Sequence, residues 1–224
     1  MVQLNQTYKQ IADSFDIDES RVQTSITSIW DTLRDVLVKD LVPSSPFKYT
    51  PRRKFVNHPD ALGAIDATLI EVTKPTNRED NKAFYSGKHG RHGGKVQVLV
   101  GPDGTCLHMS NVLNGSRHDY YLYQESGLEQ ILTRGRDRKD YPKILADGGY
   151  LGMVQTYSNV VIPVRKAPGG SLTSAQKEFN RLLSQDRSVV ERFFGRLKLY
   201  WNIMRGCTVQ IDLHWIPSLK YALH

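Results

Sequence analysis

The sequence predicts an α/β protein in which helices flank the faces of a mixed sheet and a short helical segment precedes it. Strand-like apolar runs separated by turn residues fill residues 61–165. The period of an amphipathic helix dominates residues 173–204, and the same period, broken once, covers the first forty residues. Strands combined with flanking helices favour a single layered core.

Composition limits the classes of function open to the chain. Its 224 residues suit one domain of ordinary size with a small appendage, and 39% hydrophobic with 24% charged residues are typical of a soluble globular protein. The formal charge of +7 permits a polyanionic partner. Cys106 and Cys207 form no CxxC pair, so we expect a reducing, intracellular location and no zinc knuckle. No apolar run suggests a secretory signal or a membrane span.

The N-terminal segment, residues 1–42, predicts two helices joined by a tight turn. Apolar residues recur at helical spacing on both sides of DIDES, and each helix begins with a capping-box pattern, Thr7 with Gln10 and Ser20 with Gln23. A DNA-binding helix-turn-helix has this layout. A helical hairpin packed on the main domain has it too, and the second helix has few basic residues. In the first interpretation the groove-facing candidates are Arg21, Gln23, Thr24 and Ser25.

The expected domain organisation continues with a linker and a larger domain. The stretch VPSSPFKYTPRRK contains three prolines and ends in basic residues, so we expect residues 43–60 to form a linker or an extended arm suited to a phosphate backbone. The main domain is expected over residues 61–206, and residues 207–224 form its C-terminal end. Because the first segment lacks the supporting helix usual in such modules and the end falls within an apolar stretch, we expect a truncated chain.

The elements of the main domain can be predicted in order. ALGAIDATLIEV is a strand buried on both faces that carries one acid, Asp66. KVQVLV and TCLHMSNVL, joined by the turn GPDG, form a hairpin. GSRHDYYLYQESGLEQIL is a helix capped near Asp119. KILAD and VVIPVR are two further strands, and two helices, 173–184 and 186–204, close the chain.

Three acids fall where these elements can bring them together. Asp66 lies within the first strand, Asp147 ends the strand KILAD, and Glu191 borders the apolar face of the last helix. Asp147 by itself is explained by the Asp-Gly-Gly turn that it begins. Three gathered carboxylates, however, repel one another unless a cation neutralises them, and an all-oxygen set favours Mg²⁺ or Mn²⁺.

Two such ions promote phosphodiester cleavage by activating a water and stabilising the leaving oxygen. The chain then needs basic side chains along its substrate. The candidate phosphate contacts are Lys88, Lys95, Arg165, Lys166, Arg187 and Lys198.

Five blocks carry a resemblance to a known family. GAIDATLIEVTKP, YSGKHGRHGGKVQVLVGPDG, NGSRHDYYLY, ILADGGYLG and SQDRSVVERFFGRLKLYWNIMRG follow the order and approximate spacing of the DDE superfamily endonuclease domain, and look most like Harbinger-type transposases. The resemblance implies a ribonuclease-H-like fold in which Asp66, Asp147 and Glu191 bind two metal ions. Such an enzyme cuts DNA at transposon ends and joins the 3′-hydroxyl to target DNA.

The resemblance also implies partners and a location. Double-stranded DNA is the expected substrate, similar systems need a second, Myb-like DNA-binding protein, and the chain is a candidate homo-oligomer. In a eukaryotic host the protein would act in the nucleus.

Asp119 allows two interpretations. It falls in the family's GSxxD block, which makes it a possible fourth metal ligand, but a helix N-cap favours aspartate for reasons unrelated to metal. The neighbouring histidines, His118, His89 and His92, have no zinc-ligand spacing on a helix, so we interpret them as polar or DNA-facing.

Two other functions compete with the transposase. A transposon-derived regulator keeps the fold and binds DNA without cutting it, and an intact triad argues against this without excluding it. A haloacid-dehalogenase phosphatase also carries a strand-borne aspartate. That class needs a second aspartate two residues later, where this chain has Thr68.

Overall fold

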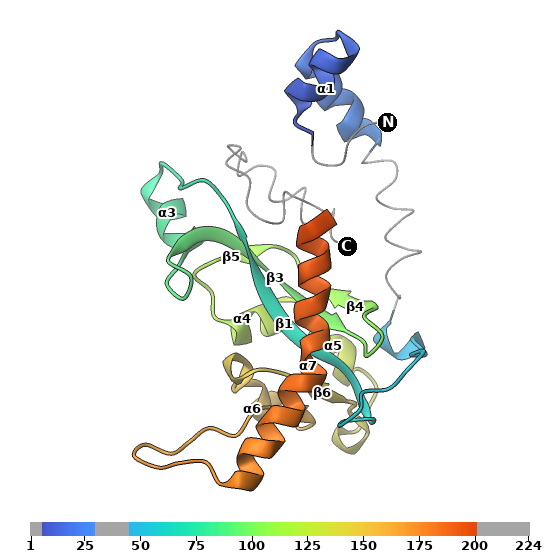
Figure 1. Cartoon of the computed structure of the whole chain (residues 1–224), viewed down its shortest axis with the longest axis vertical. Helices are drawn as coiled ribbons and strands as arrows, with labels where there is room; N and C mark the ends of the chain where they lie inside the picture. The colour runs from blue at the N-terminus through green and yellow to red at the C-terminus, as the bar shows by residue number, and fades with distance from the viewer. Residues whose placement is uncertain (1–5, 30–44, 201–224) are drawn as a thin grey trace.

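The computed structural model describes residues 6–29 and 45–200 of the chain. A seven-stranded sheet forms its centre, with the long helix α7 (Ser174–Tyr200) crossing one face and α4 (Asp119–Glu125), α5 (Leu128–Thr133) and α6 (Met153–Thr156) behind it (Figure 1). In this part of the chain, no helix combines the length and the apolar character needed to cross a bilayer.

The sheet is mixed, with β1 (Ala61–Glu71) at its middle. On one side, β3 (Arg91–Val100) runs antiparallel to β1, and β4 (Cys106–Met109), β5 (Leu113–Asn114) and β2 (Tyr85–Ser86) all pair with β3. On the other side, β6 (Lys143–Leu145) runs parallel to β1 and β7 (Val160–Val161) runs parallel to β6. Three antiparallel strands followed by two parallel ones, in the order β4-β3-β1-β6-β7, confirm the expected ribonuclease-H-like α/β sheet.

Both faces of the sheet are buried. Because side chains alternate along each strand, neighbouring residues belong to opposite faces. Ala64 belongs to the cluster under α7, together with Val190 and Phe194. Ile65, the next residue, belongs to the opposite cluster, which includes Tyr123 and Tyr150. The expected strand at 61–72, apolar on both faces, is therefore confirmed, as is the hairpin of β3 and β4.

Short elements complete the domain. They are the helix α3 (Arg78–Phe84) and the 3₁₀ turns η1 (Pro46–Lys48), η2 (Arg138–Asp140) and η3 (Gly148–Tyr150). The single helix expected around Asp119 is two helices, because Gly127 adopts a left-handed conformation with φ of 73° and ends the first.

The two helices expected at the end of the domain are one continuous helix, α7, so that prediction was wrong. Asp186 resembles an N-cap in the sequence, but its carboxylate accepts bonds from outside the helix. The donors are the Asn57 backbone N–H at 3.0 Å, the Asn57 side chain at 3.1 Å and His58 Nδ1 at 2.9 Å. Residues 201–204 of the expected helix and the expected C-terminal end, 207–224, lie outside the described residues.

These contacts hold residues 45–60 against the domain as an extended arm. The Tyr49 hydroxyl donates to Asp103, and the Phe55 side chain is buried in the core under α7. Asn57 and the following histidine then bind Asp186. The arm therefore reaches from the β3–β4 turn to α7.

Two helices are present near the N-terminus, as expected. The first, α1 (Tyr8–Phe15), has the expected capping box between Thr7 and Gln10. The second is helical from residue 19 to 29, so the cap expected at Ser20 was wrong: the Asp18 carbonyl accepts from the first turn instead. Aspartate caps as well as serine, which explains why the helix begins earlier. Residues 30–42 of the expected segment lie outside the described part.

Candidate active site

Asp66 sits on β1 where the strand is packed on both faces. Its Oδ1 accepts from the Ala67 N–H at 2.8 Å, and its Oδ2 lies 3.9 Å from an Arg187 guanidinium nitrogen. The pKa of Asp66 is raised to about 6, mainly by burial and in smaller part by the charges of Asp147 and Glu191, against the opposing effects of the Ala67 N–H and Arg187. The three acids of the predicted triad therefore share one electrostatic environment.

Strand register brings Asp147 next to Asp66. Ala64 pairs with Leu145 across the parallel strands β1 and β6, and each aspartate follows two residues later on its own chain segment. Asp147 also begins the turn η3, where its Oδ1 accepts from the Gly149 N–H at 2.7 Å. The turn explanation and the proximity to Asp66 are thus both correct for this residue.

Glu191 reaches the site from α7. Val190 and Phe194 bury the helix face that rests on the sheet, while the Glu191 side chain is exposed beside that face. Arg187, one turn earlier, lies between Glu191 and the strands, with a side chain only 13% exposed. Glu191 therefore borders the site.

The donor chemistry fits a hard divalent cation. Burial is the main cause of the raised pKa of Asp66, and repulsion from Asp147 and Glu191 adds to it; a bound cation would relieve that repulsion. Within residues 6–29 and 45–200, no three acidic, histidine or cysteine side chains stand close enough to hold an ion as they are. Of the three triad acids, Glu191 is the exposed one, whereas Asp66 and Asp147 are partly buried.

Asp119 is a fourth acid in the same place. It is the first residue of α4, after His118, and its side chain makes no cap bond, so the N-cap interpretation was wrong. Its carboxylate instead faces Lys95 at 3.2 Å and Lys88 at 3.8 Å. A Cβ on Gly149 would lie 2.7 Å from Asp119 Oδ2 and 2.9 Å from Asp147 Oδ1, so these carboxylates meet at one glycine.

The six basic residues predicted to contact phosphate occupy different environments. Lys95 is buried and donates to the Arg117 carbonyl at 2.6 Å as well as to Asp119. Together with Arg187 it compensates the acids from within. Lys198 is partly buried, with its ammonium 3.5 Å from the Leu69 carbonyl.

The exposed members of this set are Lys88, Arg165 and Lys166. Arg165 donates to the Gly148 carbonyl, directly after Asp147. Lys88 and Arg165 thus border the acids, and all three side chains keep their charge accessible to solvent. His89 lies on the same β2–β3 connection as Lys88, whereas His92 lies within β3 and contacts Asn81 at 3.1 Å.

Sequence reasoning missed Tyr150, the last residue of η3. Its side chain is fully buried, and its hydroxyl has no hydrogen-bond partner among the described residues. Burial raises the pKa of Tyr150 well above its ordinary value, and the charges of Asp66, Asp119 and Asp147 add to the effect. The one sequence signal for a role of Tyr150 is its position directly after Asp-Gly-Gly.

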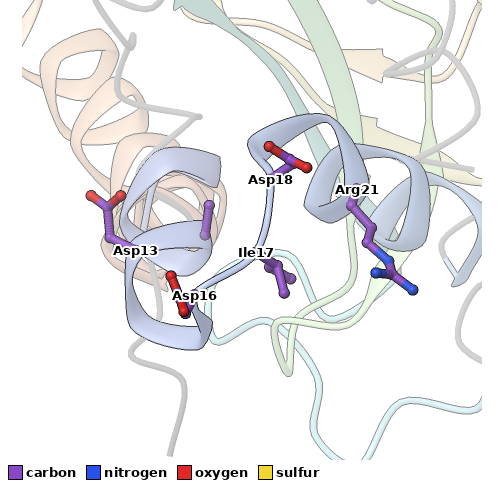
Figure 2. A pocket seen from close by; sticks show the side chains of 6 residues that line it. Asp13, Asp16, Ile17, Asp18 and Arg21 are labelled. Carbon is purple, nitrogen blue, oxygen red and sulfur yellow. The ribbon is translucent and has the colours of Figure 1, made fainter.

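The N-terminal helices form a separate candidate for DNA contact. The four groove-facing candidates are all exposed, namely Arg21, Gln23, Thr24 and Ser25. A hollow of about 360 Å³ opens at the turn between the helices, and Figure 2 shows Arg21 on its lining with Asp13, Asp16 and Asp18. These aspartates oppose a phosphate backbone at the turn itself.

Comparisons with known proteins identify the family of the chain. Residues 65–223 match the family model described as DDE superfamily endonuclease. The probable transposase for insertion sequence element IS702 of Microchaete diplosiphon is 28% identical over 88% of this chain and 66% of its own length. Protein ALP1-like of Arabidopsis thaliana is 23% identical over 73% of this chain and 41% of its own length.

The chain thus spans about two thirds and two fifths of the length of these two relatives. No solved structure matches it. The family match nevertheless extends over most of the sequence and includes all three triad acids. On this evidence the protein belongs to the DDE endonuclease superfamily.

Proposed function

We propose that this protein is a divalent-metal-dependent DNA endonuclease of the transposase type. It cuts phosphodiesters at transposon ends and joins the freed 3′-hydroxyl to target DNA. The observation that supports this most is the convergence of charge on Asp66, where burial and the charges of Asp147 and Glu191 raise the pKa to about 6. A cluster of carboxylates of this kind is suited to divalent cations and, through them, to phosphates.

Each residue of the site has a part in the proposed mechanism. Asp66, Asp147 and Glu191 would hold Mg²⁺ or Mn²⁺, with Asp119 as a further candidate ligand. When bound, two such ions supply an activated water and stabilise the leaving oxygen. The Gly149 N–H fixes one oxygen of Asp147 and thereby orients its carboxylate. Arg187 limits the repulsion among the acids before a cation arrives.

The substrate is proposed to lie along the exposed cations. Lys88 and Arg165 border the acids, Lys166 follows Arg165 in the chain, and all three present charge to solvent, as phosphate contacts require. Lys95 and Arg187 serve the acids from the interior instead. Lys198 is partly buried and is therefore intermediate in exposure between the proposed phosphate contacts and the interior cations.

The first prediction concerns metal-dependent cleavage. With Mg²⁺ or Mn²⁺ the wild type should nick duplex DNA, and Asp147→Asn or Glu191→Gln should slow nicking by on the order of a thousandfold or more, because each removes one charge from a unit that acts together. Asn retains the oxygen that caps η3, so Asp147→Asn tests charge rather than folding. Nicking is measured by gel electrophoresis of labelled duplex.

Glu178→Gln is the matched control for this experiment. Glu178 is an exposed acid on the same helix, thirteen residues before Glu191 and therefore about 20 Å away along the axis. Its substitution should leave nicking unchanged. Equal cleavage by the wild type and Asp147→Asn would contradict the catalytic assignment.

A non-catalytic, transposon-derived DNA-binding or regulatory protein is the alternative. If neither the wild type nor its variants cut, while the wild type binds duplex DNA with a steep salt dependence, this alternative replaces the first. The Myb-like partner, the homo-oligomer and the nuclear location stay predictions, and size-exclusion chromatography with and without DNA tests the oligomer.

A further inference from the structure

The hydroxyl of Tyr150 is a buried donor inside the acid site. Tyr150 ends the turn that Asp147 caps, and its ring packs among the apolar side chains under the sheet, with no part exposed. Its hydroxyl oxygen has no hydrogen-bond partner within the described residues. Gly149, the residue before it, lies where the carboxylates of Asp119 and Asp147 meet, and the charges of Asp66, Asp119 and Asp147 act on the hydroxyl.

Asp66 has bonding capacity to spare. Its Oδ1 accepts from the Ala67 N–H, while its Oδ2 has Arg187 at 3.9 Å, which is too long for a hydrogen bond. The Nε of Arg187 is buried and without a partner as well. Two unpaired donors and an under-bonded carboxylate oxygen therefore lie in one charged interior.

Buried polar groups without a partner are rare, because each loses its bonds to water and gains nothing in return. A phenylalanine at position 150 would fill the same apolar space without that loss. A hydroxyl retained there is best explained by an acceptor that it meets in another state of the site. The group cannot attack DNA itself, because none of its surface is exposed.

We infer that Tyr150 is a positioning residue of the acid site, whose hydroxyl donates to an aspartate carboxylate, foremost that of Asp66, when a divalent cation draws the acids together. A ligand carboxylate fixed by such a donor keeps its orientation toward the ion. The inference rests on the proposed function, because it requires these acids to bind a cation.

Binding of Mn²⁺ to the whole chain, without DNA, tests this inference. Isothermal titration should give a dissociation constant about tenfold higher for Tyr150→Phe than for the wild type. The melting temperature of the cation-free protein should be unchanged or higher, since the variant removes an unpaired buried hydroxyl. If the role of Tyr150 were purely structural, its substitution would lower the melting temperature and leave the Mn²⁺ dissociation constant unchanged.

Tyr157→Phe is the matched control. Tyr157 is also fully buried, but its hydroxyl donates to the Pro142 carbonyl at 2.6 Å, away from the acids. This variant should lower the melting temperature and leave Mn²⁺ affinity as it was. Phenylalanine at either position keeps the ring, so packing is the same in both comparisons.

The outcomes separate the two proposals. An unchanged Mn²⁺ affinity in Tyr150→Phe overturns the positioning role and leaves the proposed function intact, whether or not the melting temperature falls as in Tyr157→Phe. If the wild type binds Mn²⁺ no more tightly than Asp66→Asn, the cation site itself fails, and the positioning role fails with it.

Discussion

Asp66 illustrates how a single residue couples the site to the fold. An ionised acid on a strand packed on both faces loses hydration, and here two further acids oppose its charge. One backbone N–H and a distant guanidinium compensate only in part. The metal-free fold is therefore less stable whenever Asp66 is ionised.

This cost gives a pH-dependent prediction for the metal-free protein. The pKa of Asp66 rises from 3.8 to about 6 on folding, so between these values the folded state holds a proton that the unfolded state has released. Stability should fall as pH rises from about 4 to about 6, by about 3 kcal/mol in all, and stay low above that range. In EDTA, Asp66→Asn should thus gain stability over the wild type at pH 7 and little at pH 4, measured by thermal melting.

Asp60→Asn provides the comparison for Asp66. Asp60 is an exposed acid just before the same strand, and its bond from Lys143 lowers its pKa. Because that shift has the opposite sign, its substitution should bring no gain at pH 7. If the stabilities of the wild type and of Asp66→Asn changed in parallel with pH, the role of burial at Asp66 would be contradicted.

At the scale of elements, the site depends on how α7 is fixed. Glu191 and Arg187 reach the strands only if α7 is correctly placed along the sheet. Asp186, one residue before Arg187, is the point at which the arm holds this helix. A buried acid that looks like a helix start in the sequence is instead a tertiary anchor.

The size of a mutational effect distinguishes these two roles. Asp186→Ala leaves the Asn57 N–H and His58 Nδ1 without their acceptor, which should cost about 2–4 kcal/mol. Loss of an N-cap alone would cost about 1 kcal/mol. Urea unfolding measures the difference, and Glu178→Ala, at an exposed site on the same helix, should leave the midpoint nearly unchanged. A loss no larger than that of a cap would contradict the anchoring role.

At the scale of the whole molecule, the basic side chains behind the formal charge of +7 are divided between the interior and the surface. Lys95 and Arg187 compensate acids internally, whereas Lys88, Arg165 and Lys166 remain exposed near the site. DNA binding should therefore depend on far fewer cations than the composition suggests. The salt dependence of binding counts them.

Lys166→Gln should lower the slope of log affinity against log salt by about one, because one phosphate contact is lost. Lys177→Gln, an exposed lysine near the start of α7, should leave the slope unchanged. Fluorescence anisotropy on a labelled duplex measures both. Equal slopes for the wild type and Lys166→Gln would remove this residue from the interface.

The same titration tests the N-terminal segment. If the two helices contact DNA as a helix-turn-helix, Arg21→Gln should also lower the slope. An unchanged slope would favour the plain helical hairpin, in agreement with the aspartates around the turn.

The sequence by itself determined which local elements form and which acids compete for the site. β1 and the β3–β4 hairpin follow from alternation and turn residues, and Asp66, Asp147 and Glu191 follow from motifs in a fixed order. Boundaries were harder to predict: Gly127 divided one expected helix, and Asp186 did not divide another.

Only the tertiary structure decided what each polar group does. Asp119 meets Lys95 and Lys88 rather than capping its own helix, Asp186 binds the arm, and the Tyr150 hydroxyl lies among acids from distant segments. Periodicity and turn residues are encoded within a few neighbouring residues, so the sequence reveals them. Ion pairs and buried donors depend on which segments the sheet brings together, and no local pattern contains that information.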